Sequence, residues 1–180
     1  MKIFHSKIET RLGLISVFAL NNGLVRISIG TDTDNIFAAV QEFNKWKIEW
    51  DCANDITLQT CEQLKRYFKN ELTFFNVPLY LIGTPFQKKV WKELRKIPFG
   101  EVRSYQQIAV AIKNPLSVRA VGNANGRNPI PIIIPCHRVV RKDGHLGGFT
   151  GGVQLKDWLL RHEGISINLF KSKLDIPERA

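Results

Sequence analysis

The first third of the chain alternates between hydrophobic and polar positions. Residues 2–8, 13–20 and 24–30 each carry a partly alternating pattern, which is typical of strands with one buried face. Asn21-Asn22-Gly23, between the second and third of these segments, is a turn sequence. The pattern therefore predicts an antiparallel hairpin or meander.

Helical periodicity follows the strands. Asp34 can cap a helix that runs to about Trp46, and a second helix is predicted over residues 57–68. Residues 77–82 predict one more strand. Residues 1–83 are thus expected to form a small α/β domain that supports the rest of the protein.

Gly83-Thr84-Pro85 marks a break and the start of a helix at once. Thr84 suits the N-cap position and Pro85 suits the first helical turn. An apolar stripe then marks one face of this helix, formed by Phe86, Val90, Trp91 and Leu94.

A pair of short helices is predicted next. Ser104 can cap a helix over residues 105–112, and after a three-residue turn a second helix runs over residues 116–125. This is a helix-turn-helix pattern, although many helical hairpins share it. With a last helix over residues 153–161, the chain is expected to have an α+β fold in which residues 84–180 form a mainly helical domain.

The positive charge of the chain lies entirely in this second part. Residues 1–83 carry nine Lys/Arg and nine Asp/Glu, whereas residues 84–180 carry 17 and seven, which accounts for the net charge of +10. A segment this basic favours a polyanionic partner, either nucleic acid or a membrane surface. The basic amphipathic helix of a membrane binder is not evident. We therefore favour nucleic acid over a basic surface kept only for solubility.

The cellular setting follows from what the chain lacks. It has no run of 18 apolar residues, and its charged N-terminus does not resemble a signal peptide. Three cysteines, an odd number, favour free thiols in a reducing compartment, so we expect the cytoplasm, and the nucleoid if the source is bacterial. The His and Cys residues show no metal-binding spacing, so no metal is expected.

Small residues characterise the second helix of the pair. Gly122 in a helix interior costs about 1 kcal/mol relative to alanine, so its presence should be compensated. With Ala120 it would let the backbone approach either another helix or a DNA groove closely. Arg119 is the one long cation in the middle of this helix, and it is either a solvated salt-bridge residue or a DNA contact.

Candidate chemistry is concentrated around Cys136. Three prolines within positions 129–135 exclude a helix before it, and His137 and Arg138 follow directly. A neighbouring cation lowers the pKa of a thiol, and the thiolate is the nucleophile, so we favour a reactive cysteine over a buried structural one. Cys52 and Cys61 have no such neighbours and are expected to be structural.

A glycine-rich loop follows, with five glycines between positions 144 and 152 and with Phe149 and Thr150 in its middle. It could close over a small ligand or be a flexible connection, and it lacks the Gly-Lys-Ser/Thr of a phosphate loop. Glu163 could orient His137 if the fold brings them together, or it could be a surface carboxylate near a helix end.

Residues 84–163 resemble the O6-alkylguanine-DNA alkyltransferases, the suicide repair proteins for methylated guanine. The matching pieces occur in order and at family-like spacing, whereas residues 1–80 match only in type. The pieces are Gly83-Thr84-Pro85-Phe86-Gln87 with Val90-Trp91, Ile97-Pro98-Phe99-Gly100 with Ser104-Tyr105, Arg119-Ala120-Val121-Gly122 with Asn125 and Asn128-Pro129, Ile134-Pro135-Cys136-His137-Arg138-Val139, and Lys156 with Leu159-Leu160 and Glu163-Gly164.

The resemblance implies a stoichiometric reaction without a cofactor. The alkyl group of O6-alkylguanine, and also of O4-alkylthymine, would move irreversibly to Cys136. His137 would draw the thiol proton off through a water, Glu163 would orient His137, and Asn128 would hold the turn before the cysteine. The substrate pocket would be lined by Tyr105, Val139, Phe149 and Thr150.

The implied partner is double-stranded DNA, bound by a monomer in the minor groove. An O6 atom inside a duplex is hidden from side chains, so the damaged nucleotide must be flipped out. Arg119 would fill the space that it leaves, and Tyr105 would contact the displaced nucleotide and its phosphate. We expect Ser104, Ala120 and Gly122 to complete the DNA contacts.

One residue departs from the family pattern, and three other functions compete. Phe149 stands where the family usually has tyrosine, so a hydroxyl is missing. A non-enzymatic relative that only binds alkylguanine would lack the acceptor cysteine, which is present here. A thiol hydrolase using Cys136, His137 and Glu163 would not explain the basic second part. A helix-turn-helix regulator would not explain the cysteine site.

Overall fold

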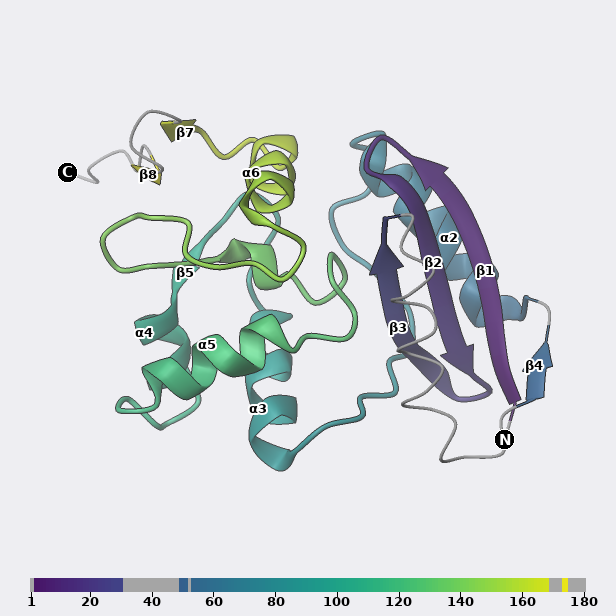
Figure 1. Cartoon of the computed structure of the whole chain (residues 1–180), viewed down its shortest axis with the longest axis horizontal. Coiled ribbons are helices and arrows are strands. Elements are labelled where there is room, and N and C mark those ends of the chain that lie inside the picture. Colours follow the sequence, from purple (N-terminus) through teal and green to yellow (C-terminus); the bar gives the residue numbers. More distant parts are fainter. Residues whose placement is uncertain (1, 31–48, 52, 169–172, 175–180) are drawn as a thin grey trace. The chain divides into compact units, whose positions relative to one another are not determined.

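The computed structural model describes residues 2–30, 49–51, 53–168 and 173–174. The chain divides into two compact units, Met1–Ile82 and Gly83–Ala180. The first is built on a sheet and the second mainly on helices (Figure 1).

The first unit is organised around a sheet with the strand order β3-β2-β1-β4. β1 (Lys2–Thr10), β2 (Gly13–Leu20) and β3 (Gly23–Ile29) are antiparallel neighbours, which confirms the predicted meander. The short strand β4 (Glu49–Asp51) pairs in parallel with β1.

Helix α2 (Asp55–Phe68) packs against this sheet. It begins two residues earlier than predicted because Asn54 is the N-cap: Asn54 Oδ1 accepts from the Thr57 N–H, and Thr57 Oγ1 accepts from the Asn54 N–H, each at 3.0 Å. Leu64 and Tyr67 on its inner face are fully buried. The helix predicted from Asp34 lies outside the described residues.

The strand predicted over residues 77–82 is wrong. Only Leu79 forms a bridge, to Leu24 of β3. The Leu24 N–H donates to the Pro78 carbonyl and the Tyr80 N–H donates to the Leu24 carbonyl, each at 2.8 Å. Because Pro78 has no N–H to donate, the pairing cannot extend from Leu79 back toward residue 77.

The second unit is mainly helical, which confirms the predicted α+β fold. No helix among the described residues is long and apolar enough to cross a membrane. The helices of the second unit are α3 (Pro85–Leu94), α4 (Tyr105–Ala111), α5 (Val118–Gly126) and α6 (Val153–His162). Its short strands are β5 (Arg103–Ser104), parallel to β6 (Val139–Val140), and β7 (Ile167–Asn168), antiparallel to β8 (Lys173–Leu174).

Side-chain caps determine where α3 and α4 begin, as predicted. Thr84 Oγ1 accepts from the Gln87 N–H at 3.2 Å, and Ser104 Oγ accepts from the Gln107 N–H at 3.1 Å. Each glutamine side chain accepts from the N–H of its cap residue in return, so both helices start with a capping box.

α5 begins at Val118, two residues later than predicted. Lys113 has φ 58°, which extends the preceding turn, and Ser117 supplies no side-chain cap. The helix is fixed to α3 instead by a buried bond: the Trp91 indole N–H donates to the Ala124 carbonyl at 2.8 Å. This bond holds the buried side of α5 against α3 and leaves the opposite side of α5 exposed.

Candidate active site

Cys136 opens a 3-10 turn, η1 (Cys136–Arg138), which follows α5 and precedes β6 along the chain. The segment before it folds back on itself: the Ile134 N–H donates to the Ile130 carbonyl at 2.9 Å, and Ile132 has φ 73°. Only 4% of Cys136 is exposed. The turn therefore holds the thiol within the unit.

Asn128 ties this turn to the sulfur. Its Nδ2 donates to the Ile134 carbonyl at 2.7 Å and to Cys136 Sγ at 3.0 Å. Its Oδ1 accepts from the Ile130 N–H at 3.0 Å. A donor aimed at sulfur favours the thiolate, since the charged form is the better acceptor. Asn125, which had no predicted role, donates to the Cys136 carbonyl at 3.2 Å.

Glu163 is bound by the side chains of His137 and Arg138, the two residues that follow Cys136 in the turn. Its Oε1 is 2.8 Å from His137 Nε2. Arg138 donates to both carboxylate oxygens, at 2.7 Å to Oε2 and 3.0 Å to Oε1, and to the Ile97 carbonyl at 2.6 Å. His137, Arg138 and Glu163 are 0%, 5% and 3% exposed. The fold does bring His137 and Glu163 together, and it adds Arg138, to which sequence reasoning gave no role there.

Burial and charge decide the protonation of this trio. Burial raises the pKa of Glu163, but the hydrogen bonds from His137 and Arg138 and the charge of Arg138 outweigh it, and the pKa falls to about 2. Burial lowers the pKa of His137, and Glu163 opposes this only in part. The imidazole is therefore neutral, with Nε2–H donating to Glu163 and Nδ1 left as the acceptor. Nδ1 is buried and has no hydrogen-bond partner in the described part of the chain.

The pKa of the Cys136 thiol is raised, mainly by burial. The hydrogen bond from Asn128 and the charge of Lys156 lower it in part. The expectation of a pKa lowered by the adjacent cation is wrong, because burial outweighs the groups that lower the pKa, and the Arg138 guanidinium is bonded to Glu163. The thiolate is supported by groups that are distant in the sequence.

Lys156 is a second buried cation of the site, in addition to Arg138, and it had no predicted role. It is 0% exposed, and its ammonium donates to the Val139 carbonyl at 2.5 Å and to the Leu146 carbonyl. Burial lowers its pKa to about 8. The sequence did contain a signal for this burial, because Lys156 is spaced three and four residues from Leu159 and Leu160 and shares the buried face of α6 with them. A lysine on such a face needs polar partners.

Tyr105 lies beside the Lys156 ammonium. Lys156 Nζ is 6.0 Å from the centre of its ring. Burial raises the pKa of the phenol, and the charge of Cys136 adds to the rise. A Cβ at Gly147, which has φ +69°, would lie 3.2 Å from the phenol oxygen. Glycine at that position therefore lets the loop approach the ring. Val139, another predicted pocket residue, is fully buried.

Phe149 and Thr150, the remaining predicted pocket residues, lie in the loop before α6. Phe149 is half-buried, and a Cβ at Gly151 would lie 3.2 Å from its ring. Thr150 is exposed, and its hydroxyl donates to the Gly126 carbonyl at 2.5 Å. This bond anchors the loop to the end of α5.

Two family models together span most of the chain. Residues 3–81 match the ribonuclease-like domain of 6-O-methylguanine DNA methyltransferase, and residues 85–165 match its DNA binding domain. A protein of Acanthamoeba polyphaga mimivirus named "Probable methylated-DNA--protein-cysteine methyltransferase" is 44% identical over 157 residues, which are 87% of this chain and 93% of that protein. The chain belongs to the 6-O-methylguanine DNA methyltransferase family.

Other relatives of the family agree in sequence and in fold. The methylated-DNA–protein-cysteine methyltransferase of Shigella flexneri is 51% identical over 104 residues, 57% of this chain and 61% of that protein, so the match spans less than two thirds of that relative. The crystal structure of Mycobacterium tuberculosis O6-methylguanine methyltransferase has a TM-score of 0.77 at 38% identity, covering 89% of this chain and 92% of that one. A crystal structure of Mycobacterium tuberculosis OGT in complex with DNA has a TM-score of 0.74 at 38% identity, covering 91% and 92%.

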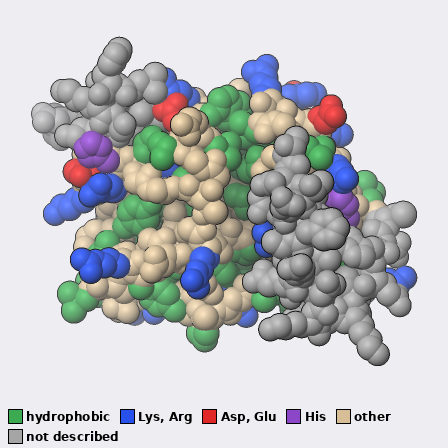
Figure 2. Space-filling model, in the orientation of Figure 1, with side chains coloured by type: hydrophobic (Ala, Val, Ile, Leu, Met, Phe, Trp, Pro, Cys, Tyr) green, Lys and Arg blue, Asp and Glu red, His purple; other side chains and the backbone are tan. Residues whose placement is uncertain are grey.

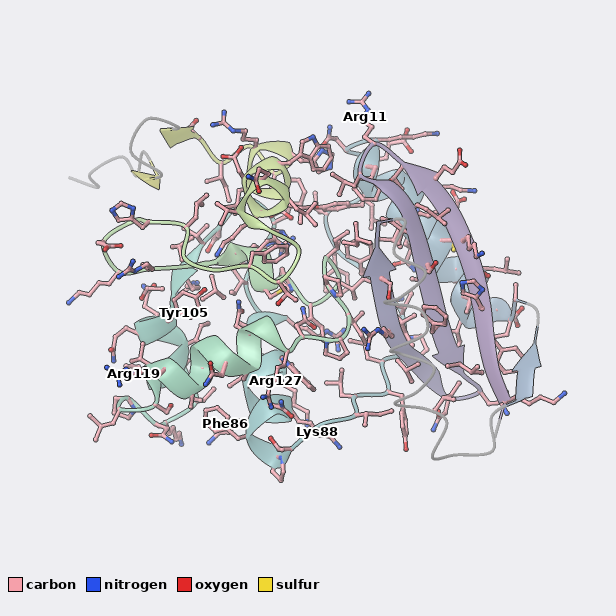
Figure 3. All side chains as sticks on the ribbon, viewed as in Figure 1. Arg11, Phe86, Lys88, Tyr105, Arg119 and Arg127 are labelled. Atoms are coloured by element: carbon pink, nitrogen blue, oxygen red, sulfur yellow. The ribbon has the colours of Figure 1, made fainter. Side chains whose placement is uncertain are left out.

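Figure 3 shows two of the predicted DNA contacts of this family member, Tyr105 on α4 and Arg119 on α5. Ala120 and Gly122 also belong to α5, and Ser104 is the N-cap of α4. Arg119 and Ala120 are exposed, and the Arg119 side chain has no polar partner within the described residues. Gly122 is half-buried, and a Cβ there would make only an ordinary contact of 3.9 Å with the Tyr105 ring. Close packing inside the protein therefore does not require this glycine. The Ser104 hydroxyl is engaged in capping α4.

The remaining predictions concern metals and the other cysteines. The described residues contain no group of three or more His, Cys, Asp or Glu placed to hold a metal ion. Cys61 is buried and its pKa is raised by that burial, whereas Cys52 lies outside the described residues.

In the half of Figure 2 that shows the second unit, Lys and Arg side chains surround an area of hydrophobic and uncharged atoms.

Proposed function

We propose that this member of the 6-O-methylguanine DNA methyltransferase family repairs O6-alkylguanine in DNA by moving the alkyl group to Cys136, once per molecule. The observation that carries the assignment is the buried Cys136 sulfur, which accepts a hydrogen bond from Asn128 at 3.0 Å and lies in the field of Lys156. In the transfer, sulfur forms a bond to the alkyl carbon and the carbon–O6 bond breaks. Guanine leaves with the electron pair and takes up a proton, and the thioether is permanent.

The thiol must lose its proton before it attacks. We assign this step to His137, whose Nε2–H is committed to Glu163 at 2.8 Å and whose Nδ1 is the available base. A water carries the proton from Cys136 to Nδ1. Asn128 and Lys156 stabilise the negative sulfur that remains. No cofactor takes part.

The substrate reaches the thiol by flipping out of double-stranded DNA, since O6 is hidden within the stack. Arg119 fills the space, and Ser104, Ala120 and Gly122 complete the contact of α4 and α5 with the minor groove. The extrahelical base lies among Tyr105, Val139, Phe149 and Thr150. The same pocket takes O4-alkylthymine.

The two parts of the chain divide the work. Residues 84–180 bind DNA and accept the alkyl group, while residues 1–83 support them. The protein acts as a monomer, because one Cys136 and one α4–α5 pair complete the reaction.

The test is the mass of the intact protein after incubation with a duplex containing one O6-methylguanine. We expect one added methyl group that maps to Cys136, and none in Cys136→Ala. Cys61→Ala is the matched control, since Cys61 is also buried but has no role in transfer. Methylation of the Cys136→Ala variant would overturn the assignment.

Tight binding of the damaged duplex without any mass change would indicate a protein that only binds the lesion, or a transfer step impaired by Phe149. Phe149→Tyr distinguishes these two outcomes, since it restores the hydroxyl usual in the family. Methyl transfer by this variant alone would identify Phe149 as the cause.

A further inference from the structure

A row of cations lies on one side of α3. Lys88, Lys92 and Arg95 recur at intervals of four and three residues, which places them on one face, and all three are exposed. Their side chains have no ion pair within the described ranges of the chain. The one acidic residue of the helix, Glu93, pairs instead with Lys96 at 2.7 Å.

α5 has a cation at each end of its exposed face. Arg119, Asn123 and Arg127 recur every four residues, and all three are exposed. Arg127 is the C-cap residue, and its side chain has no acidic partner among the residues that the structure describes. Eight residues separate the two arginines, which is about 12 Å along a helix axis.

One cation of α3, Lys88, and one of α5, Arg127, lie near the place where the two helices pack together. The Trp91 indole donates to the Ala124 carbonyl at 2.8 Å. Lys88 lies one turn before Trp91, and Arg127 lies one turn after Ala124. Figure 3 shows Lys88 and Arg127 at this junction and Arg119 at the opposite end of α5.

Helix stability explains only part of this charge. The helix dipole favours cations near a C-terminus, which accounts for Arg95 and Arg127. Lys88 lies in the N-terminal half of α3, where the dipole favours acids, and the first turn has no acidic residue to offset it. Lys88 therefore indicates an anionic partner from outside the chain.

We infer that Lys88, Lys92, Arg95 and Arg127, the α3–α5 basic surface, bind phosphates of the same DNA duplex that Arg119 enters. The inference rests on the proposed function, because Arg119 sets the position of the duplex. A base pair advances the duplex by about 3.4 Å, so a span of about 12 Å along α5 corresponds to about three or four base pairs. The surface thus extends the contact along the duplex, away from the flipped nucleotide.

The salt dependence of DNA binding tests this surface. Each phosphate contact that is lost should lower the slope of log K against log salt by about 1. We expect Lys88→Ala/Arg127→Ala to lower the slope by about 2 and to weaken binding of an undamaged duplex more than tenfold at low salt. Lys65→Ala, an exposed lysine on α2, is the matched control and should leave the slope unchanged. The rate of methyl transfer from free O6-methylguanine, which has no phosphate, should be unchanged in both the double variant and the control.

Duplex length locates the contact. Shortening the flank of the duplex on one side of the lesion to about two base pairs should weaken binding by the wild type but not by the double variant. An unchanged slope in the double variant would overturn the inference and leave the surface to a partner other than DNA. Failure of the proposed function would be seen separately, as wild-type Cys136 without a methyl group.

Discussion

The surroundings of the acceptor thiol and the exposed face of α5 use charge in opposite ways. His137, Arg138, Lys156 and Glu163 are at most 5% exposed, and each is held by hydrogen bonds. Arg119 is exposed, and its side chain has no polar partner in the described part of the chain. Buried charges keep a fixed orientation, which reactions need, whereas exposed cations can exchange water and counterions for phosphates. Catalysis and DNA affinity should therefore separate under mutation.

The largest effect is expected from Glu163→Gln. The change removes the negative charge that holds His137 and Arg138, so the imidazole loses its orientation and its support as a base. We expect the transfer rate at saturating DNA to fall by about 10²- to 10⁴-fold, with DNA binding unchanged. Single-turnover kinetics and binding by fluorescence anisotropy measure both. Glu62→Gln, on the exposed side of α2, is the control, and an unaltered rate in Glu163→Gln would remove His137 from the proton path.

Acid should destabilise the buried site specifically. The pKa of Glu163 is lowered from 4.5 to about 2, so its ionised form is favoured by folding. This contribution, about 3 kcal/mol, is complete above about pH 4.5 and is lost as the pH falls toward 2. Urea unfolding between these pH values should show the loss in the wild type and not in Glu163→Gln. Parallel curves for the two proteins would contradict the assignment.

A smaller effect on rate is expected from Lys156→Met. The change removes the cation that lowers the Cys136 pKa and the donors to the Val139 and Leu146 carbonyls. We expect transfer about tenfold slower at neutral pH, equivalent to a rise of about one pKa unit, with the profile displaced to higher pH. Single-turnover rates from roughly pH 6 to 9 give the profile. Lys89→Met, which changes an exposed lysine of α3, is the control and should leave the pH profile in place. An unchanged pH profile in Lys156→Met would show that the ammonium has no influence on the thiol.

The smallest effect on the chemical step is expected from Arg119→Ala. The side chain is exposed, so the free energy of unfolding should change by no more than about 0.5 kcal/mol. Binding to damaged duplex should weaken, and transfer from DNA should slow at low DNA concentration. Transfer from free O6-methylguanine should keep the wild-type rate, as intact-protein mass against time would show. A slower reaction with the free base would mean that the two regions are not separate.

Much of the fold could be predicted from short-range patterns in the sequence. The alternation in residues 2–30 predicted β1 to β3, and Thr84 and Ser104 predicted the starts of α3 and α4, because strands and caps depend on neighbours within a few residues. The strand predicted over residues 77–82 was wrong, and part of the reason is also local, since Pro78 has no N–H for a ladder on its side of Leu79. A hydrophobic pattern alone does not register that missing donor.

The order of the residues alone shows which groups are present: a thiol next to an imidazole, a small-residue helix with one central arginine, and a basic second half. Their electrostatics depend on how the chain folds. The fold pairs His137 with Glu163 across 26 positions, directs Lys156 to the Val139 and Leu146 carbonyls, and buries Cys136 so that its pKa rises. Desolvation and hydrogen bonding act through space, so residues adjacent in the chain do not determine the pKa of a buried group.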